Sequence, residues 1–319
     1  ALMAYYPPGS TFKLINGLIA QQEGVLRTDT RYPCARGWPV GGGKPKCHPH
    51  PSPLDLPGSV QHSCNSYYAF VFRSIMQNNK YKKTEDAYAS WKDYVESFGV
   101  GKRLHSDLSQ ELKGNVPSIK YYNKYFGEGH WNAYTIISLA IGQGELGITP
   151  LQMANIVSII ANRGFYYTPH IIKAVGEKKY LKKEFQEKHS TKVDPRFFDP
   201  IREGMDKVTS GTASNGRING INISGKTGTA QNPHGEDHSL FICYAPSEDP
   251  KIAIGIMVEN AGYGNTYAVP IATLMIEKYL RPDSAISRPD LEKRMLEANL
   301  LSKTSTNEKK RTGKPVSGN

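Results

Sequence analysis

The sequence predicts an α+β domain, because helical patterns fill most of the first 209 residues and strand patterns follow them. Apolar residues recur at three- and four-residue steps in the first part, whereas beyond Gly216 they alternate with polar or small residues. One more apolar helix closes the pattern, and no internal repeat interrupts it. A chain of 319 residues can bury one large core or two ordinary ones. These patterns together favour an antiparallel sheet flanked by helices.

The helical segments are bounded by residues that start or stop helices. Two prolines and a glycine at residues 7–9 precede the first segment, and Thr149-Pro150 opens another that stops before Gly164. The expected helices cover residues 10–23, 56–76, 85–98, 151–162, 199–209 and 269–280. The segments 33–58 and 99–125 lack a helical period or are rich in Gly and Pro, so we expect them to be irregular.

Three strands are expected after the helices. Residues 221–231 alternate in polarity, and two apolar runs, 239–244 and 252–258, are joined by a Pro-containing hairpin connection. These elements complete one domain over residues 1–280. From residue 281 the chain is polar and basic, and we expect the tail 281–319 to be largely disordered.

Composition and charge restrict the function classes. Charged residues make up 22% and hydrophobic residues 38%, as in soluble globular domains. No apolar run approaches the roughly 18 residues that span a bilayer, and no signal-peptide pattern opens the chain. The net charge of +11 is partly concentrated in residues 173–192 and 303–314. Because no nucleic-acid reader fold accompanies this charge, we expect no nucleic-acid partner. A surface facing lipid headgroups or a wall polymer is favoured instead.

Ser10 and Lys13 stand three residues apart at the start of the first expected helix, on one face. A hydroxyl becomes a good nucleophile when a neighbouring base removes its proton. Lysine serves as that base only when burial or a second cation lowers its pKa. The pair is therefore a candidate nucleophile and activator. Ser-x-x-Lys alone also occurs in many proteins in which the serine caps a helix and the lysine is solvated.

Three of the four cysteines fall within residues 34–64, a segment that also contains His48 and His50. Cys34 and Cys47 flank a Gly- and Pro-rich loop, and Cys64 follows on the next helical segment. These thiols are free, disulfide-bonded, or ligands of a tetrahedral zinc ion together with His48 or His50. The spacing matches no standard zinc module, so the three alternatives stay open. No metal ligand and no cofactor is assigned to the chemistry.

Three short motifs occur in order along the chain, and they are Ser10-x-x-Lys13, Ser63-x-Asn65 and Lys226-Thr227-Gly228. Together they form the signature of penicillin-binding proteins and class A serine β-lactamases. The chain further resembles the transpeptidase domain of class B penicillin-binding proteins in residues 6–13, 143–145, 149–154, 211–213 and 226–231. The segment from Cys34 to Asn65 is similar to that of the elongation-type enzyme, which works with the rod-shape machinery.

The resemblance covers about residues 1–280 and implies a fold like that of serine β-lactamases. It implies D,D-transpeptidation, in which peptidoglycan stem peptides ending in D-Ala-D-Ala are cross-linked through an acyl-enzyme, and β-lactams acylate the same serine. The implied catalytic residues are Ser10, Lys13, Ser63, Asn65 and Lys226. The backbone N–H groups of Ser10 and Thr229 would form the oxyanion hole. Substrate binding would fall to Lys226, Thr227, Gly228 and Thr229.

Two finer expectations concern the strand that carries the third motif. Lys226, together with Ser63, would keep Lys13 neutral, in part through repulsion between like charges. The missing Cβ of Gly228 would let the substrate backbone lie against the strand. Lys226 and the two neighbouring threonine hydroxyls, those of Thr227 and Thr229, would receive the terminal carboxylate.

The resemblance also implies a cellular setting. In this family a membrane helix, a pedestal domain and the first strands of the catalytic sheet precede the segments found here. We therefore expect residue 1 to lie inside a domain and the strand 252–258 to have an open edge. The implied location is the inner membrane, with the catalytic domain on the periplasmic side. The implied partner is a membrane glycosyltransferase of the elongation machinery.

Three other functions share the acylation chemistry. A D,D-carboxypeptidase uses water instead of an amine as acceptor, and the sequence does not distinguish the two. A class A β-lactamase uses a glutamate to position the deacylating water, and no candidate stands in a suitable segment. A non-catalytic β-lactam sensor would be acylated once and would not turn over stem peptides.

Overall fold

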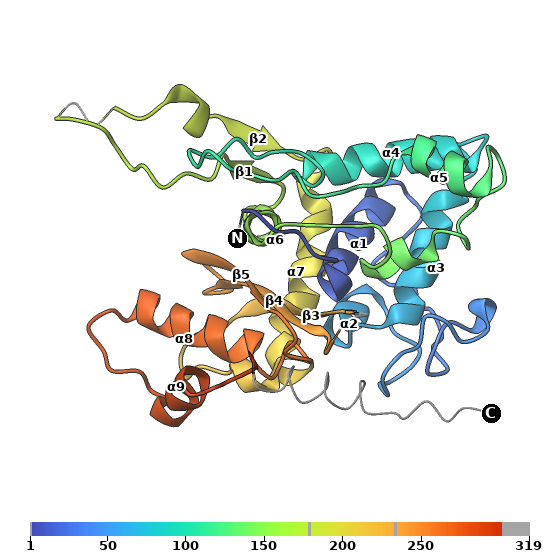
Figure 1. Ribbon diagram of the computed structural model, residues 1–319. Helices are drawn as coiled ribbons and strands as arrows, with labels where there is room; N and C mark the ends of the chain where they lie inside the picture. The colour runs from blue at the N-terminus through green and yellow to red at the C-terminus, as the bar shows by residue number, and fades with distance from the viewer. Residues whose placement is uncertain (1, 178–179, 233–234, 302–319) are drawn as a thin grey trace, which may run out of the picture.

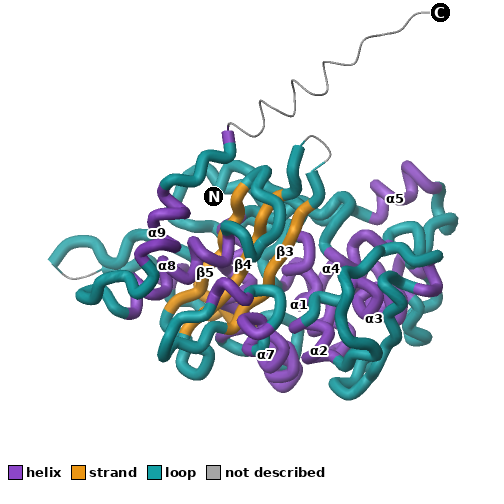
Figure 2. Tube along the Cα trace, turned by 90° about the horizontal axis from the view of Figure 1, so that it is seen from below, coloured by secondary structure: helices purple, strands orange, loops and turns teal. Residues whose placement is uncertain are grey.

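The computed structural model describes residues 2–177, 180–232 and 235–301. Its main sheet has three antiparallel strands in the order β3 (Ser224–Ala230), β4 (His238–Ala245) and β5 (Ile252–Val258). Helices flank this sheet, and a mainly helical region fills the other half of the molecule (Figure 1 and Figure 2). The predicted α+β class and the antiparallel sheet are therefore confirmed.

The remaining elements surround the sheet or form the helical region. The longer helices are α1 (Lys13–Gln22), α2 (Leu56–Gln61), α3 (Asn65–Met76), α4 (Thr84–Ser97), α5 (Ile119–Phe126), α6 (Pro150–Ala161), α7 (Phe198–Asp206), α8 (Ala268–Leu280) and α9 (Pro289–Leu296). A second, two-stranded sheet pairs β1 (Phe165–Tyr167) with β2 (Lys188–Ser190).

The central strand β4 divides the core in two. Its even-numbered residues from Leu240 to Tyr244 belong to the larger cluster, shared with α1 and α6, whereas the odd-numbered residues from Phe241 to Ala245 pack with α8. Successive side chains of a strand point to opposite faces, so one buried strand serves both clusters. Because both faces are covered, the sequence of β4 is a continuous apolar run.

Helix α1 lies at the centre of the molecule, and every residue from Lys13 to Gln21 is buried. The chain enters α1 through a 3₁₀ turn, Gly9–Phe12, which holds Ser10. The sequence places Ser10 on the first α-helical turn, and the structure corrects this. Gly9 has φ +54°, and a Cβ there would lie 2.5 Å from the backbone oxygen of Thr229. Glycine thus lets this turn pack directly against β3.

The predicted helix over residues 56–76 is two helices, α2 and α3, which separate at Ser63. Ser63 has φ +54°, a left-handed conformation that a serine seldom adopts and that ends a right-handed helix. Cys64 then caps α3, because its Sγ accepts a hydrogen bond from the backbone N–H of Tyr67. The break leaves Ser63 on a connection and Asn65 on the first turn of α3.

Regular structure also forms where the sequence indicates none. Helix α5 lies at the end of the segment 99–125, where Ser118 caps it by accepting from the N–H of Tyr121. Helix α9 lies in the tail expected to be disordered. Buried Glu277 holds this part of the tail against α8, because it accepts from the N–H of Ser287 and faces Arg288 at 3.6 Å. Residues 302–319, for which disorder is expected most, lie outside the described residues.

Strand β5 forms one edge of the main sheet. Within the described residues it pairs only with β4, so its second edge carries no neighbouring strand. This agrees with the open edge expected for residues 252–258. Across the described ranges, no helix is both long enough and apolar enough to cross a bilayer.

Candidate active site

A pocket of about 800 Å³ opens where the 3₁₀ turn before α1, the start of α3 and strand β3 meet. Parts of all three sequence motifs line it, namely Ser10, the pair Ser63 and Asn65, and residues 227–229. The motifs are separated by about 50 and 160 residues in the chain, and the fold brings them to one place. The expected juxtaposition of the trio is therefore present.

Lys13, three residues after Ser10, is completely buried, and its Nζ contacts the second motif. It donates to the backbone oxygen of Ser63 at 2.7 Å and to Oδ1 of Asn65 at 2.5 Å, and it lies 3.1 Å from Oγ of Ser63. A neutral amine has two N–H groups and one lone pair. The carbonyl and the amide oxygen only accept, so they take both N–H groups and leave the lone pair for a hydroxyl.

Burial sets the protonation of the two motif lysines. Desolvation lowers the pKa of Lys13 to about 8. Lys226 is also fully buried, and its pKa is lowered well below the ordinary value, first by desolvation and then by the charge of Lys13. Repulsion by Lys226 was expected to neutralise Lys13. The structure corrects this, because burial is the main cause for both amines.

Strand β3 contacts the 3₁₀ turn through its backbone. The peptide of Thr229 lies against Gly9, next to Ser10, and its carbonyl accepts a hydrogen bond from the side chain of Gln143 at 3.2 Å. On the same strand, Oγ1 of Thr227 donates to Oγ1 of Thr212 at 2.8 Å. Gln143, from the segment 143–145 that resembles the family, thus holds Thr229 and also lines the pocket.

The structure bears on two expectations for β3. Gly228 lines the pocket, and a Cβ there would lie 3.0 Å from the Cβ of Leu240 and from Cγ2 of Thr11, so protein packing also requires a glycine at this position. Lys226 is fully buried, does not line the pocket, and donates to the backbone oxygen of Thr227. The Lys226 amine therefore contacts the neighbouring backbone, and it is not exposed to a ligand's carboxylate.

The pocket also contains residues to which the sequence analysis assigned no role in catalysis or substrate binding. The loop before α2 contributes Lys46 and His48, and the loop between β5 and α8 contributes residues 263–266. Thr212 comes from the segment after α7. Lys46 and His48 are the two neighbours of Cys47 in a Gly- and Pro-rich loop. This position next to a possible metal ligand is the sequence feature that could have identified them. Thr212 lies in the segment 211–213 that resembles the family, whereas residues 263–266 lie in a loop without any local motif.

A cluster of possible metal ligands adjoins this pocket. The ligand atoms of Cys34, Cys47, His50 and Cys64 all lie within 4.8 Å of one another. Three thiols and one imidazole form the donor set of a tetrahedral structural zinc site. All four cysteines of the chain are free thiols in the structure, and the geometry selects His50 from the two candidate histidines. Among the three interpretations left open, the structure favours the zinc site.

We expect the purified protein to contain close to one zinc ion per chain, and Cys47→Ser to lose most of it. Because Cys64 precedes Asn65 directly, metal loss should also lower the melting temperature and slow acylation by penicillin. Elemental analysis and thermal unfolding check this. Cys243→Ala, in the sheet core, is the matched control that keeps the metal. Unchanged zinc content in Cys47→Ser would exclude the site.

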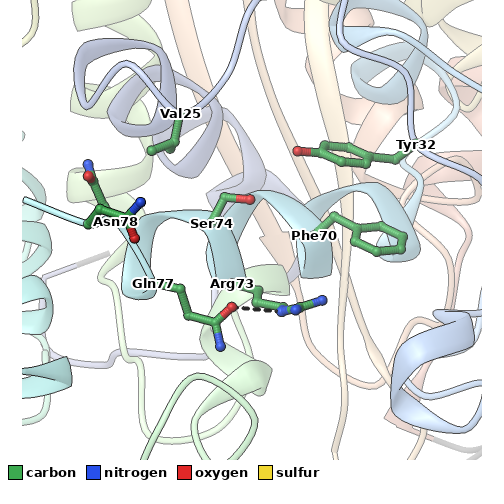
Figure 3. Close-up of a pocket in the computed structure, with 8 residues that line it drawn as sticks. Val25, Tyr32, Phe70, Arg73, Ser74, Gln77 and Asn78 are labelled. Carbon is green, nitrogen blue, oxygen red and sulfur yellow. Dashed lines mark hydrogen bonds between the residues drawn. The ribbon is translucent and has the colours of Figure 1, made fainter.

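A second hollow, of about 550 Å³, lies on the outer side of α3 and is lined by polar and aromatic side chains (Figure 3). Nε of Arg73 donates to Oε1 of Gln77 at 2.9 Å, and Tyr32 stacks on Phe70. No motif residue lines it. The chemistry implied by the motifs therefore belongs to the first pocket.

Comparisons with known proteins match this chain to one protein family. The sequence profile of the penicillin binding protein transpeptidase domain matches residues 1–277. The peptidoglycan D,D-transpeptidase MrdA of Haemophilus influenzae is 27% identical over 307 residues, covering 88% of this chain and 45% of that protein. For PbpA of Mycolicibacterium smegmatis the identity is 28% over 306 residues, covering 89% and 57%. The chain thus spans about half the length of these curated relatives.

Solved structures show the same similarity. PBP2 of Pseudomonas aeruginosa, in complex with WCK 5153, superposes with a TM-score of 0.73 at 27% identity and covers 88% of this chain and 60% of that one. PBP2 of Helicobacter pylori gives a TM-score of 0.73 at 26% identity, covering 89% and 51%. These matches confirm the resemblance to elongation-type class B enzymes. The chain belongs to the penicillin-binding protein transpeptidase domain family.

Proposed function

We propose that the protein is a serine D,D-transpeptidase that cross-links peptidoglycan stem peptides in cell-wall elongation and cell shape. The observation that carries this proposal is the placement of Lys13. Its buried amine, with a pKa of about 8, is held by Ser63 and Asn65, and these two residues line the same pocket as Ser10. A serine hydroxyl next to such an amine is a nucleophile with its general base in place.

In the proposed acylation, Oγ of Ser10 attacks the carbonyl carbon of the penultimate D-Ala. The proton of the hydroxyl moves to Nζ of Lys13, whose two N–H groups stay on the Ser63 carbonyl and Asn65. Ser63, 3.1 Å from Nζ, then relays a proton to the nitrogen of the leaving D-Ala. The C–N bond breaks and an ester on Ser10 remains.

The oxyanion of the tetrahedral intermediate would be held by the backbone N–H groups of Ser10 and Thr229. The contact of Gly9 with Thr229 supports this, because it brings β3 next to Ser10, and Gln143 orients the Thr229 peptide. One such donor typically contributes about 3 kcal/mol to transition-state stabilisation. The Thr227 and Thr229 hydroxyls would bind the terminal carboxylate of the stem peptide, with Lys226 buried behind them.

The second half of the reaction transfers the acyl group to an amine of another stem peptide. The amine nitrogen attacks the ester carbonyl, its proton passes to the Lys13–Ser63 pair, and Ser10 is released as a hydroxyl. β-Lactams would acylate Ser10 by the same first step. In the natural protein this domain would work on the periplasmic side of the inner membrane, beside a membrane glycosyltransferase of the elongation machinery.

The test is intact-mass analysis of the full-length protein with penicillin, and separately with a D-Ala-D-Ala pentapeptide plus an acceptor amine. We expect a stable penicillin adduct and a cross-linked peptide product. Release of free D-Ala with a hydrolysed peptide alone would identify a D,D-carboxypeptidase. A penicillin adduct without any peptide turnover would identify a sensor, and rapid penicillin hydrolysis a β-lactamase.

A further inference from the structure

The exposed positive charge of the catalytic pocket comes from a residue outside the three motifs. The two motif lysines are fully buried, whereas Lys46 is exposed and lines the pocket. It is the only lysine or arginine among the described residues that line it, and Asp237 is the only acidic one. A ligand that enters this pocket therefore meets one accessible cationic side chain.

Lys46 is tied to the catalytic group through its backbone. Its carbonyl accepts a hydrogen bond at 2.6 Å from Nδ2 of Asn65, whose Oδ1 accepts from Nζ of Lys13. Cys47, the next residue, belongs to the cluster of possible metal ligands, which holds this loop against α3. The position of the Lys46 backbone is thus fixed relative to Asn65, while the side chain remains free to reach a ligand.

Within the described part of the chain, the side-chain charge of Lys46 is not neutralised by an ion pair. None of the ion pairs formed by the described residues includes it. A lysine that faces a binding pocket and forms no ion pair attracts anions into that pocket. Residues 227–229 of β3, which would bind the peptide's terminal carboxylate, belong to a different element from the loop that carries Lys46. The two sites therefore suit two different carboxylates.

We propose that Lys46 is a specificity residue that binds a second carboxylate of the donor peptide, on the side chain of the residue before D-Ala-D-Ala. This inference rests on the proposed function. With the terminal carboxylate at β3 and the scissile carbonyl at Ser10, the preceding residue continues past Asn65, and Lys46 lies there. Asp237, on the loop between β3 and β4, contributes the opposite charge to the same pocket.

The test compares two synthetic donors that differ in one group, a carboxylate or a carboxamide on the side chain before D-Ala-D-Ala. Acylation of the full-length protein is measured with both donors for the natural sequence, Lys46→Ala and Lys46→Glu. Lys44→Glu is the matched control, since Lys44 is exposed in the same loop and does not line the pocket. The ratio of the two rates cancels general losses of activity.

We expect the natural protein to prefer the carboxylate donor by about three- to tenfold, the range of a partly exposed charge pair, with the preference falling as salt rises. Lys46→Ala should abolish the preference and Lys46→Glu reverse it, whereas Lys44→Glu should retain it. Equal shifts in Lys46→Glu and Lys44→Glu, or no preference in the natural protein, would overturn the proposal. If penicillin and both donors leave the natural protein unacylated, the proposed function itself fails.

Discussion

Ser10→Ala is expected to abolish the formation of any acyl-enzyme, with penicillin and with stem peptides alike. The substitution removes the hydroxyl that the 3₁₀ turn Gly9–Phe12 presents to the pocket, next to the contact between Gly9 and Thr229. In serine hydrolases, loss of the nucleophile lowers turnover by about 10⁶-fold, because the other groups act only through it. Labelling with a fluorescent penicillin, followed by gel analysis and intact mass, measures the effect.

The matched control for this variant is Ser74→Ala, which removes a serine hydroxyl in the second hollow on α3 (Figure 3). It should be labelled like the natural protein. Equal melting temperatures would show that Ser10→Ala is folded, as expected from its half-buried position. A labelled Ser10→Ala protein would place the nucleophile elsewhere and remove the basis of the proposed mechanism.

The rate of acylation by a β-lactam that does not itself titrate near neutral pH is expected to rise about tenfold per pH unit below pH 8. Above pH 8 the rate should level off. The base must be uncharged to accept the proton of Ser10, and burial lowers the pKa of Lys13 to about 8. Lys13→Met keeps the size of the side chain and removes the base. Its acylation should be 10²- to 10⁴-fold slower, without the rise near pH 8.

The same shift has a consequence for stability. The pKa of Lys13 in the folded protein, about 8, lies below its ordinary value of 10.5, so the unfolded chain binds the proton more tightly. Protonated Lys13 therefore destabilises the fold below pH 8, and this cost is lost as the pH rises from about 8 to 10.5.

For the rate of acylation, a profile that is flat between pH 6 and 9 would contradict the assignment of Lys13 as base.

The sequence predicted which residues lie at the pocket better than it predicted the local geometry around them. Ser-x-x-Lys, Ser-x-Asn and Lys-Thr-Gly are local patterns, and the residues that form them all lie at or directly behind the pocket. The break at Ser63 was not predictable, because a left-handed serine leaves no mark in the periodicity that runs from α2 into α3. Helix α9 was missed because a buried ion pair with Glu277, and not an apolar face, holds this segment.

The roles of charged side chains in the pocket depended on burial, and the sequence carries little information on burial of single residues. Lys226 and Lys46 have the same side chain, yet the fold buries Lys226 completely and leaves Lys46 exposed at the pocket. The choice of His50 over His48 in the cysteine cluster was likewise a matter of loop conformation.

By itself, the sequence determined the α+β order, the three motifs and the family, since each rests on short-range patterns. Only the tertiary structure decided which amine faces a ligand, which histidine joins the thiols, and why Gly9 and Gly228 are glycines. These features depend on contacts between segments far apart in the chain, such as Gly9 with Thr229 and Lys13 with Asn65. Distances of that kind arise from packing, which no local pattern records.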